Sequence, residues 1–328
     1  MLVQLLVAVA AGAANPPSSF PPRCTTMDAT GTDPEMRWFC QGSGHPEPDP
    51  KKWEFRTCTN LHLVCAPPVA AEAKPQLLVF LPGTGLGPMD YTEPVIDMSS
   101  HGFYALGLQY PSTQGQNGCD VSRKPAGSTD LNCTARERYR VLTGEASSYG
   151  GSDHTTNITA PDSIQNRLAK ALLKLGAPWS KWLTGSGAPD WSSIIIAGHS
   201  NGADHASFVA KTFSVARALT FAGANDMVDG PNPGKWQHVH AAPWQFANAS
   251  HHATPPERMY GFGVCGTATH KAQGECYDWH AGWLAQQYPG PWFRADAVLG
   301  DATGKGLAGH HAGLQIQPEA AGGGGGGK

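Results

Sequence analysis

Five short, continuously apolar runs constrain the fold of this chain more than any other feature of its sequence. They are rich in leucine, β-branched and aromatic residues, and each ends at or near a glycine or proline. Continuous apolarity is typical of strands that are covered on both faces, as in parallel sheets. We therefore expect five buried strands, at residues 76–81, 103–110, 192–197, 215–222 and 259–264.

Helical patterns lie between these runs. One helix is predicted to begin near Thr159 and to end at Gly176, because apolar residues recur at near-i+4 spacing, at Ile164, Leu168, Leu172 and Leu175. A second is predicted over residues 201–213. Alternation of strands and helices predicts an α/β fold with a mostly parallel, doubly wound sheet and right-handed connections.

Some segments do not follow this alternation. Residues 53–58 and 61–65 predict a short hairpin. Residues 112–156 and 230–256 are longer than ordinary connections, so we expect them to be loop insertions that either cover a site or are disordered.

The composition excludes several classes of protein. Of 328 residues, 40% are hydrophobic and 15% charged, and the net charge is −3. Because no block of lysine or arginine occurs, an electrostatic nucleic-acid binder is not expected. After the N-terminus, no apolar run reaches the roughly 18 residues that a membrane-spanning helix needs. We therefore expect neither a nucleic-acid partner nor a membrane span.

The first residues predict export. The apolar run LVQLLVAVAA at 2–11 precedes Ala11-Gly12-Ala13, which fits a signal-peptidase cleavage site. No lysine or arginine precedes the run, so a buried N-terminal helix is the alternative. We predict a signal peptide at 1–14, an N-terminal extension at 15–50, one folded domain at 51–315 and a flexible glycine-rich tail at 316–328.

Cysteines and sequons agree with an extracellular protein. The chain has eight cysteines, and an even number in an exported chain indicates disulfides. Since they fall as near neighbours in sequence, we predict the local pairs 24/40, 58/65, 119/133 and 265/276. Three N-x-[ST] sequons, at Asn132, Asn157 and Asn248, favour a secreted glycoprotein.

One motif points to chemistry. The residues Gly198-His199-Ser200-Asn201-Gly202 form a G-x-S-x-G pattern directly after a predicted strand and before a predicted helix. A nucleophile elbow requires this order, because the serine is presented on a tight strand-to-helix turn between small residues. The helix N-terminus would direct N–H groups at a developing oxyanion. The alternative is a glycine-rich turn with an inert serine.

A second glycine-rich segment supports this interpretation. The sequence PGTGLGP at 82–88 follows the first predicted strand, and ligands bind at the carboxyl ends of parallel strands. Acyl transfer needs two N–H donors, and we predict those of Thr84 and Asn201. The alternatives are a plain turn or a phosphate cradle; no G-K-[ST] follows, which argues against a nucleotide P-loop.

The order of these motifs resembles the α/β-hydrolase superfamily, and within it a subgroup of secreted serine hydrolases. The likeness spans about residues 75–315. It includes the strands that end in PGTG, YP and GHSNG, and further on GAND at 223–226, APW at 242–244 and the His310-His311 pair. The resemblance implies an α/β-hydrolase fold and serine-hydrolase chemistry.

Serine hydrolases also need a general base and a carboxylate that orients it. In this superfamily the chain order is serine, acid, histidine. His310 and His311, in the loop after a predicted strand at 293–299, are the candidate bases; the alternative is two solvated loop histidines. Asp226 is the first candidate acid and Asp278 the second, and either is alternatively a turn-capping residue.

No metal or other cofactor is expected. The His238-x-His240 pair lacks a convincing third ligand. Four tryptophans either line a groove for an acyl chain or sugar or pack in the interior; they are Trp236, Trp244, Trp279 and Trp283.

The sequence thus predicts a secreted serine esterase that acts on a small-molecule or polymeric carboxylic ester, with its oligomeric state left open. The alternatives are a non-catalytic extracellular binding protein of the same fold and a glycan-directed enzyme.

Overall fold

The structure is a computed structural model that describes residues 20–29, 61–112, 130, 132–149, 158–221, 226–228, 240–245, 252–263, 292–294 and 317–318. Its main sheet consists of β1 (Cys24–Asp28), β2 (Leu61–Cys65), β3 (Leu77–Leu81), β4 (Tyr104–Gly107), β5 (Ile194–His199), β6 (Arg217–Phe221), β9 (Met259–Gly263), β10 (Trp292–Arg294) and β11 (Gln317–Pro318).

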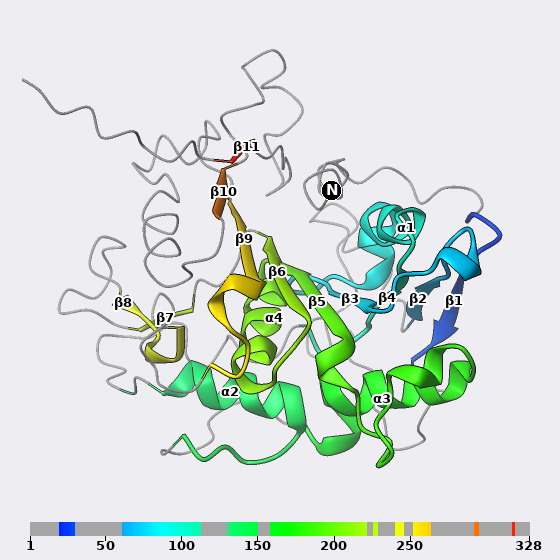
Figure 1. Ribbon diagram of the computed structural model, residues 1–328. Helices are drawn as coiled ribbons and strands as arrows, with labels where there is room; N and C mark the ends of the chain where they lie inside the picture. The colour runs from blue at the N-terminus through cyan, green and yellow to red at the C-terminus, as the bar shows by residue number, and fades with distance from the viewer. Residues whose placement is uncertain are drawn as a thin grey trace, which may run out of the picture.

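The strands of this sheet follow the order β1-β2-β4-β3-β5-β6-β9-β10-β11 (Figure 1). From β4 to β10 every neighbouring pair is parallel. The pairs β1–β2, β2–β4 and β10–β11 are antiparallel. Two further strands, β7 (Met227–Val228) and β8 (His240–Ala241), form a separate antiparallel ladder.

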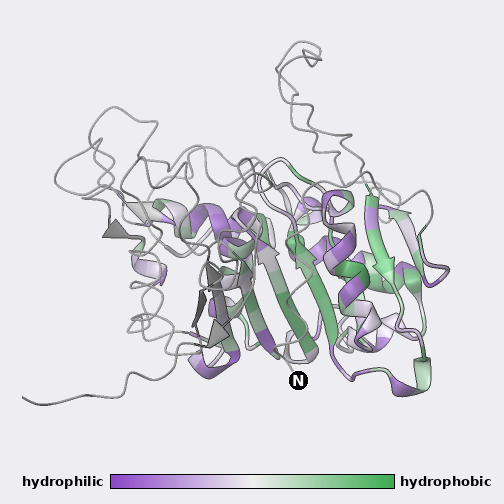
Figure 2. Cartoon of the chain, turned by 90° about the horizontal axis from the view of Figure 1, so that it is seen from above, coloured by the Kyte–Doolittle hydropathy of each residue, from purple (hydrophilic) through white to green (hydrophobic). Residues whose placement is uncertain are grey.

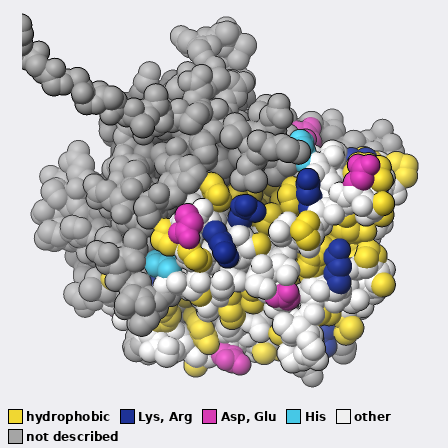
Figure 3. Space-filling view, viewed as in Figure 1, with side chains coloured by type: hydrophobic (Ala, Val, Ile, Leu, Met, Phe, Trp, Pro, Cys, Tyr) yellow, Lys and Arg dark blue, Asp and Glu magenta, His cyan; other side chains and the backbone are white. Residues whose placement is uncertain are grey.

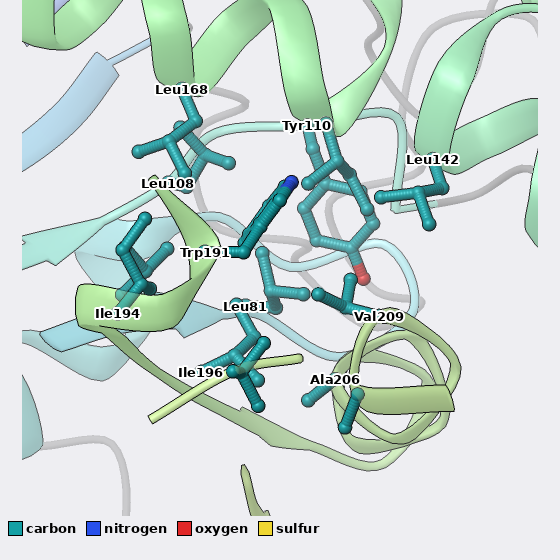
Figure 4. Close-up of a cluster of buried hydrophobic side chains, with 14 of the residues drawn as sticks. Leu81, Leu108, Tyr110, Leu142, Leu168, Trp191, Ile194, Ile196, Ala206 and Val209 are labelled. Atoms are coloured by element: carbon teal, nitrogen blue, oxygen red, sulfur yellow. The ribbon is translucent and has the colours of Figure 1, made fainter. Parts of the chain in front are cut away.

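Helices cover both faces of the sheet. They are α1 (Thr92–Ser100), α2 (Cys133–Thr143), α3 (Ile164–Leu175) and α4 (Asn201–Thr212). Val95 of α1 packs in one cluster with Leu78 and Phe80, whereas α2, α3 and α4 pack in another that contains Leu77 and Val79. Successive residues of β3 therefore point into opposite cores. Figure 2 shows the central strands as mostly hydrophobic, and Figure 4 shows Leu81 and Ile196 beside α4 in the second core.

The α/β class and the mostly parallel sheet that the sequence predicts are confirmed. Each of the five expected strands is present, as β3, β4, β5, β6 and β9. The two expected helices correspond to α3 and α4. The first begins later than predicted, because Ser163 is its N-cap and accepts a hydrogen bond from the Asn166 N–H, while residues 160–162 form a 3-10 turn.

The chain changes direction across the sheet between β3 and β5. β4 lies on one side of β3 and β5 on the other, so the chain proceeds in opposite directions across the sheet. Because β3 and β5 are parallel, the loops that follow them leave the same edge of the sheet. Such a switch point is where parallel α/β sheets bind ligands. The two glycine-rich motifs follow β3 and β5, so the fold brings them to this point.

Helix α2 lies inside the segment 112–156, where the sequence predicts a cover or disorder. Its buried side includes Arg136, Glu137 and Arg138 as well as Val141 and Leu142. Because charged residues occupy the inward face, the apolar periodicity that reveals a helix is missing from the sequence. Gly144, with a φ of 78°, ends the helix.

The predicted cysteine pairs 24/40 and 58/65 are wrong. Cys24 is bonded to Cys65, across 41 positions of sequence. The reason is the antiparallel register of β1 and β2, which sets the two residues directly opposite each other. Cys133 is also in a disulfide, and its partner, like the remaining cysteines, lies outside the described residues.

Other expectations are tested only in part. Residues 53–58 of the predicted hairpin lie outside the described residues, and β2 pairs with β1 and β4. Of the strand expected at 293–299, residues 293–294 belong to β10.

No helix in the described ranges is long and apolar enough to cross a membrane. Lysine and arginine side chains are dispersed among apolar and acidic ones on the face in Figure 3.

The disulfide yields a prediction for stability. Replacing Cys24 and Cys65 together by alanine should lower the free energy of unfolding by about 2–4 kcal/mol, because the unfolded chain regains the freedom of a long loop. Chemical denaturation of the variant and the wild type measures the difference. Equal midpoints, or a peptide map under non-reducing conditions that pairs Cys24 with Cys40, would contradict the assignment.

Candidate active site

Ser200 occupies a strained turn between β5 and α4. Its φ is 54° and its ψ −125°, and it is the one non-glycine residue with positive φ in the described part of the chain. Such a conformation costs about 1–3 kcal/mol and persists where the surrounding structure enforces it. The Ser200 N–H donates to the Phe221 carbonyl at 2.9 Å, and the Ser200 carbonyl accepts from the Ala203 and Asp204 N–H groups.

Two glycines allow this turn to form. A Cβ atom at Gly198 would overlap the carbonyl of Gly202, and one at Gly202 would overlap the carbonyl oxygens of Leu81 and Pro82. The first turn of α4 therefore lies directly against the end of β3. Ser200 is only partly buried, so the serine expected as a nucleophile stands where the two glycine-rich motifs meet.

The loop after β3 borders this turn. The Leu86 N–H donates to the Gly83 carbonyl at 3.1 Å, which closes a tight turn around Thr84, and Thr84 itself is exposed. The Gly83 N–H donates to the Tyr91 hydroxyl at 3.2 Å. That hydroxyl lies 2.8 Å from Nδ1 of His199, the residue before Ser200.

The side chain of Asn201 is fixed by buried partners. Its Nδ2 donates to the Ser112 carbonyl at 2.7 Å, and its Oδ1 accepts from the Arg138 guanidinium. Asn201 is the first residue of α4, and the N–H groups of a first helical turn have no partner within the helix. The anchored side chain therefore holds the backbone N–H that the sequence predicts as an oxyanion donor.

Arg138 joins three parts of the chain in a buried charge cluster. Its Nε and Nη2 donate to the two oxygens of Asp226 at 2.9 and 2.7 Å, and Nη2 also bonds Asp204 of α4 at 3.1 Å. Burial by itself disfavours the charged guanidinium, but these two carboxylates hold the pKa of Arg138 above its ordinary value. The cluster connects α2, α4 and Asp226, the residue directly before β7.

Asp226 has further partners. Trp244 Nε1 donates to its Oδ2 at 3.2 Å, and Gln245 donates to its backbone carbonyl at 2.7 Å. A carboxylate offers about four lone-pair sites, and Arg138 and Trp244 take three of them. The donors from the described residues thus leave one site, which suits a donor such as the N–H of an imidazole.

Trp244 is a packing residue and not part of a groove. Its side chain is buried, its ring meets Phe208 edge-to-face, and its Nε1 also donates to Thr134. Of the two alternatives for the tryptophans, the structure therefore selects interior packing at this position. Trp236, Trp279 and Trp283 lie outside the described residues.

The structure brings together Ser200, Asn201 and the Thr84 loop, and it ties Asp226 to Asn201 through Arg138. Both candidate bases, His310 and His311, lie outside the described residues, as do Asp278 and His238. Within the described ranges, no three histidine, cysteine, aspartate or glutamate residues cluster closely enough to hold a metal ion.

Sequence reasoning missed Arg138, Tyr91 and Tyr110. Arg138 lies in a polar segment, and nothing local distinguishes it from the neighbouring arginines. Tyr110 ends an apolar run directly before a proline. This pattern marks the end of a strand, but it does not reveal that the Tyr110 hydroxyl donates to the Pro82 carbonyl. Tyr91 and His199 are 108 positions apart, so no spacing rule could pair them.

Comparisons of the chain with protein-family models, with curated proteins and with solved structures give no match. The function proposed for this chain therefore rests on its own residues and geometry.

The packing of the turn yields a prediction. Gly202→Ala should destabilise the protein by about 3 kcal/mol, because the new methyl group overlaps the backbone of Leu81 and Pro82. Gly185→Ala is the matched control: a Cβ there meets nothing within 4 Å, and its φ is not positive. Thermal unfolding measures both. If both variants unfold at the same temperature as the wild type, the close approach of α4 to β3 is wrong.

Proposed function

We propose that this chain is a secreted serine hydrolase with an α/β-hydrolase fold and that it cleaves carboxylic esters through an acyl-enzyme. One observation carries the proposal: Ser200 is held at φ 54° between a strand and a helix, at the switch point of a parallel sheet. An inert serine has no need of this costly conformation, whereas a nucleophile gains exposure of its hydroxyl and proximity to helix N–H groups.

The reaction begins with attack of Ser200 Oγ on the ester carbonyl carbon, while an imidazole takes the hydroxyl proton. The negative charge that develops on the carbonyl oxygen is stabilised by the backbone N–H groups of Thr84 and Asn201. The intermediate then expels the alcohol, which takes the proton from the imidazole. Water attacks the acyl-enzyme by the same route and releases the acid and free Ser200.

The base in this proposal is His310 or His311, and the carboxylate that orients it is Asp226. The remaining lone-pair site on Asp226 and its link to the first residue of α4 support that role. Asp278 is the second candidate. The chemistry requires no metal or organic cofactor, since the serine, the imidazole and the N–H donors suffice for ester hydrolysis.

Export is part of the proposal. The leader-like N-terminus, the sequons and the even number of cysteines support an oxidising compartment outside the cell, and the disulfide between β1 and β2 is compatible with it. The substrate class is a small or polymeric carboxylic ester that reaches the partly exposed Ser200.

Hydrolysis of short-chain p-nitrophenyl esters tests the nucleophile. Ser200→Ala should lower kcat about 10⁴-fold or more, since the reaction loses its covalent route. Ser192→Ala, which removes an exposed hydroxyl before β5, should retain the wild-type rate. Equal rates for wild type and Ser200→Ala would remove the serine mechanism.

The role of Asp226 has its own test. Asp226→Asn should lower kcat about 10³-fold or more if the carboxylate orients the base. Asp204→Asn also removes a carboxylate charge that pairs with Arg138, so it is the matched control for effects that come from loss of stability alone. Steady-state kinetics and thermal unfolding are measured for both. If kcat falls by a similar small factor in both variants, Asp226 is not the carboxylate that orients the base.

A further inference from the structure

Two tyrosine hydroxyls hold the two ends of one peptide group in the loop after β3. The Tyr110 hydroxyl donates to the Pro82 carbonyl at 2.7 Å, and the Gly83 N–H donates to the Tyr91 hydroxyl at 3.2 Å. The carbonyl of Pro82 and the N–H of Gly83 belong to the same planar peptide group. Its orientation is therefore fixed at both ends.

The two tyrosines come from opposite sides of the sheet. Tyr91 belongs to the core that contains α1, with its ring centroid 5.0 Å from that of Phe80. Tyr110 belongs to the core that contains α3 and α4, where its ring meets His205 edge-to-face. Both are buried, so packing holds each hydroxyl in place.

Both hydroxyls keep their protons. Burial raises the pKa of Tyr91 and of Tyr110 well above the ordinary value. Tyr110 gives its proton to Pro82. Tyr91 accepts from Gly83, and its hydroxyl also hydrogen-bonds with Nδ1 of His199 at 2.8 Å, where the tautomer of the imidazole sets which atom donates. This contact connects the loop to the residue before Ser200.

The hydrogen bonds of Tyr91 and Tyr110 form a clamp on the Pro82–Gly83 peptide, and this clamp restricts a rotation that the loop would otherwise allow. Glycine allows a peptide group before it to rotate, because it tolerates values of φ that other residues avoid. The N–H of Thr84 belongs to the next peptide group, so a change of φ at Gly83 that ψ of Pro82 does not compensate would redirect it. A misplacement of about 1 Å can reduce catalysis by about a hundredfold.

We propose that Tyr91 and Tyr110 are positioning residues that fix the Pro82–Gly83 peptide and thereby aim the Thr84 N–H at the oxyanion, with His199 as the hydrogen-bond partner that holds Tyr91. This inference rests on the proposed function. It adds to the proposed function a pair of neutral side chains, one from each core, that determine whether the oxyanion site is formed before substrate arrives.

The test compares Tyr91→Phe and Tyr110→Phe with Tyr104→Phe, which removes the hydroxyl of a buried tyrosine at the start of β4, away from the loop after β3. We expect the first two variants to lower kcat for p-nitrophenyl esters by roughly tenfold to a hundredfold, with KM changed less than about twofold because ground-state binding does not use the oxyanion donors. Tyr104→Phe should keep the wild-type kcat. Equal losses in all three would overturn the positioning role.

The histidine supplies a conservative pair of variants. His199→Asn keeps an acceptor near the position of Nδ1, whereas His199→Leu has none. His199→Leu should reproduce the loss of Tyr91→Phe, and His199→Asn should recover part of it. If both variants lose the same activity, His199 does not act through Tyr91. This pair and Tyr91→Phe decide the matter if Tyr110→Phe fails to fold.

Hydrogen exchange separates failure of the clamp from failure of the function. In wild-type protein the Gly83 amide should exchange slowly, and Tyr91→Phe should accelerate it while the central strands keep their protection. Unchanged exchange at Gly83 would overturn the clamp even if the enzyme is active. Absence of Ser200-dependent hydrolysis would overturn the proposed function and with it the catalytic role of the clamp. The exchange rate of the Gly83 amide would still show whether the two tyrosines fix the peptide.

Discussion

The close approach of the first turn of α4 to the end of β3 is the contact on which the rest of the site depends. Only glycine fits at 198 and 202, and the chain between them has to turn so sharply that Ser200 takes a positive φ. The same contact sets the serine, the helix N-terminus and the loop after β3 at one point. This point is also where the strand order reverses, and such a point is where parallel α/β sheets bind ligands.

Side chains then fix this backbone in two ways. A charged cluster around Arg138 holds Asn201 and Asp226, and a neutral pair of tyrosines holds the loop after β3. Buried ion pairs gain little stability unless every charge is well paired. Here Arg138 meets two carboxylates, so removing any member leaves the others poorly paired. The cluster is better understood as a device that fixes geometry than as a source of stability.

The sequence predicts what depends on short-range pattern. Continuous apolar runs predicted the bounds of β3, β5 and β6 to within two residues at each end, and G-x-S-x-G after a strand predicted the turn at Ser200. It fails where the pattern is hidden or the contact is distant. Helix α2 carries arginines on its inward side, so no apolar stripe marks it. Cys24 pairs with Cys65 because of strand register, and the hydroxyls of Tyr91 and Tyr110 find partners that only the folded sheet brings near.

The claim at the centre of this account is that the hydroxyl of Ser200 is an activated nucleophile. Reaction of the folded protein with a fluorophosphonate, followed by peptide mass spectrometry, tests it most directly. The account predicts one phosphonylated residue, Ser200, and no labelling after the protein is unfolded. Labelling that is absent from the folded protein, or that is spread over several serines and persists after unfolding, would contradict it.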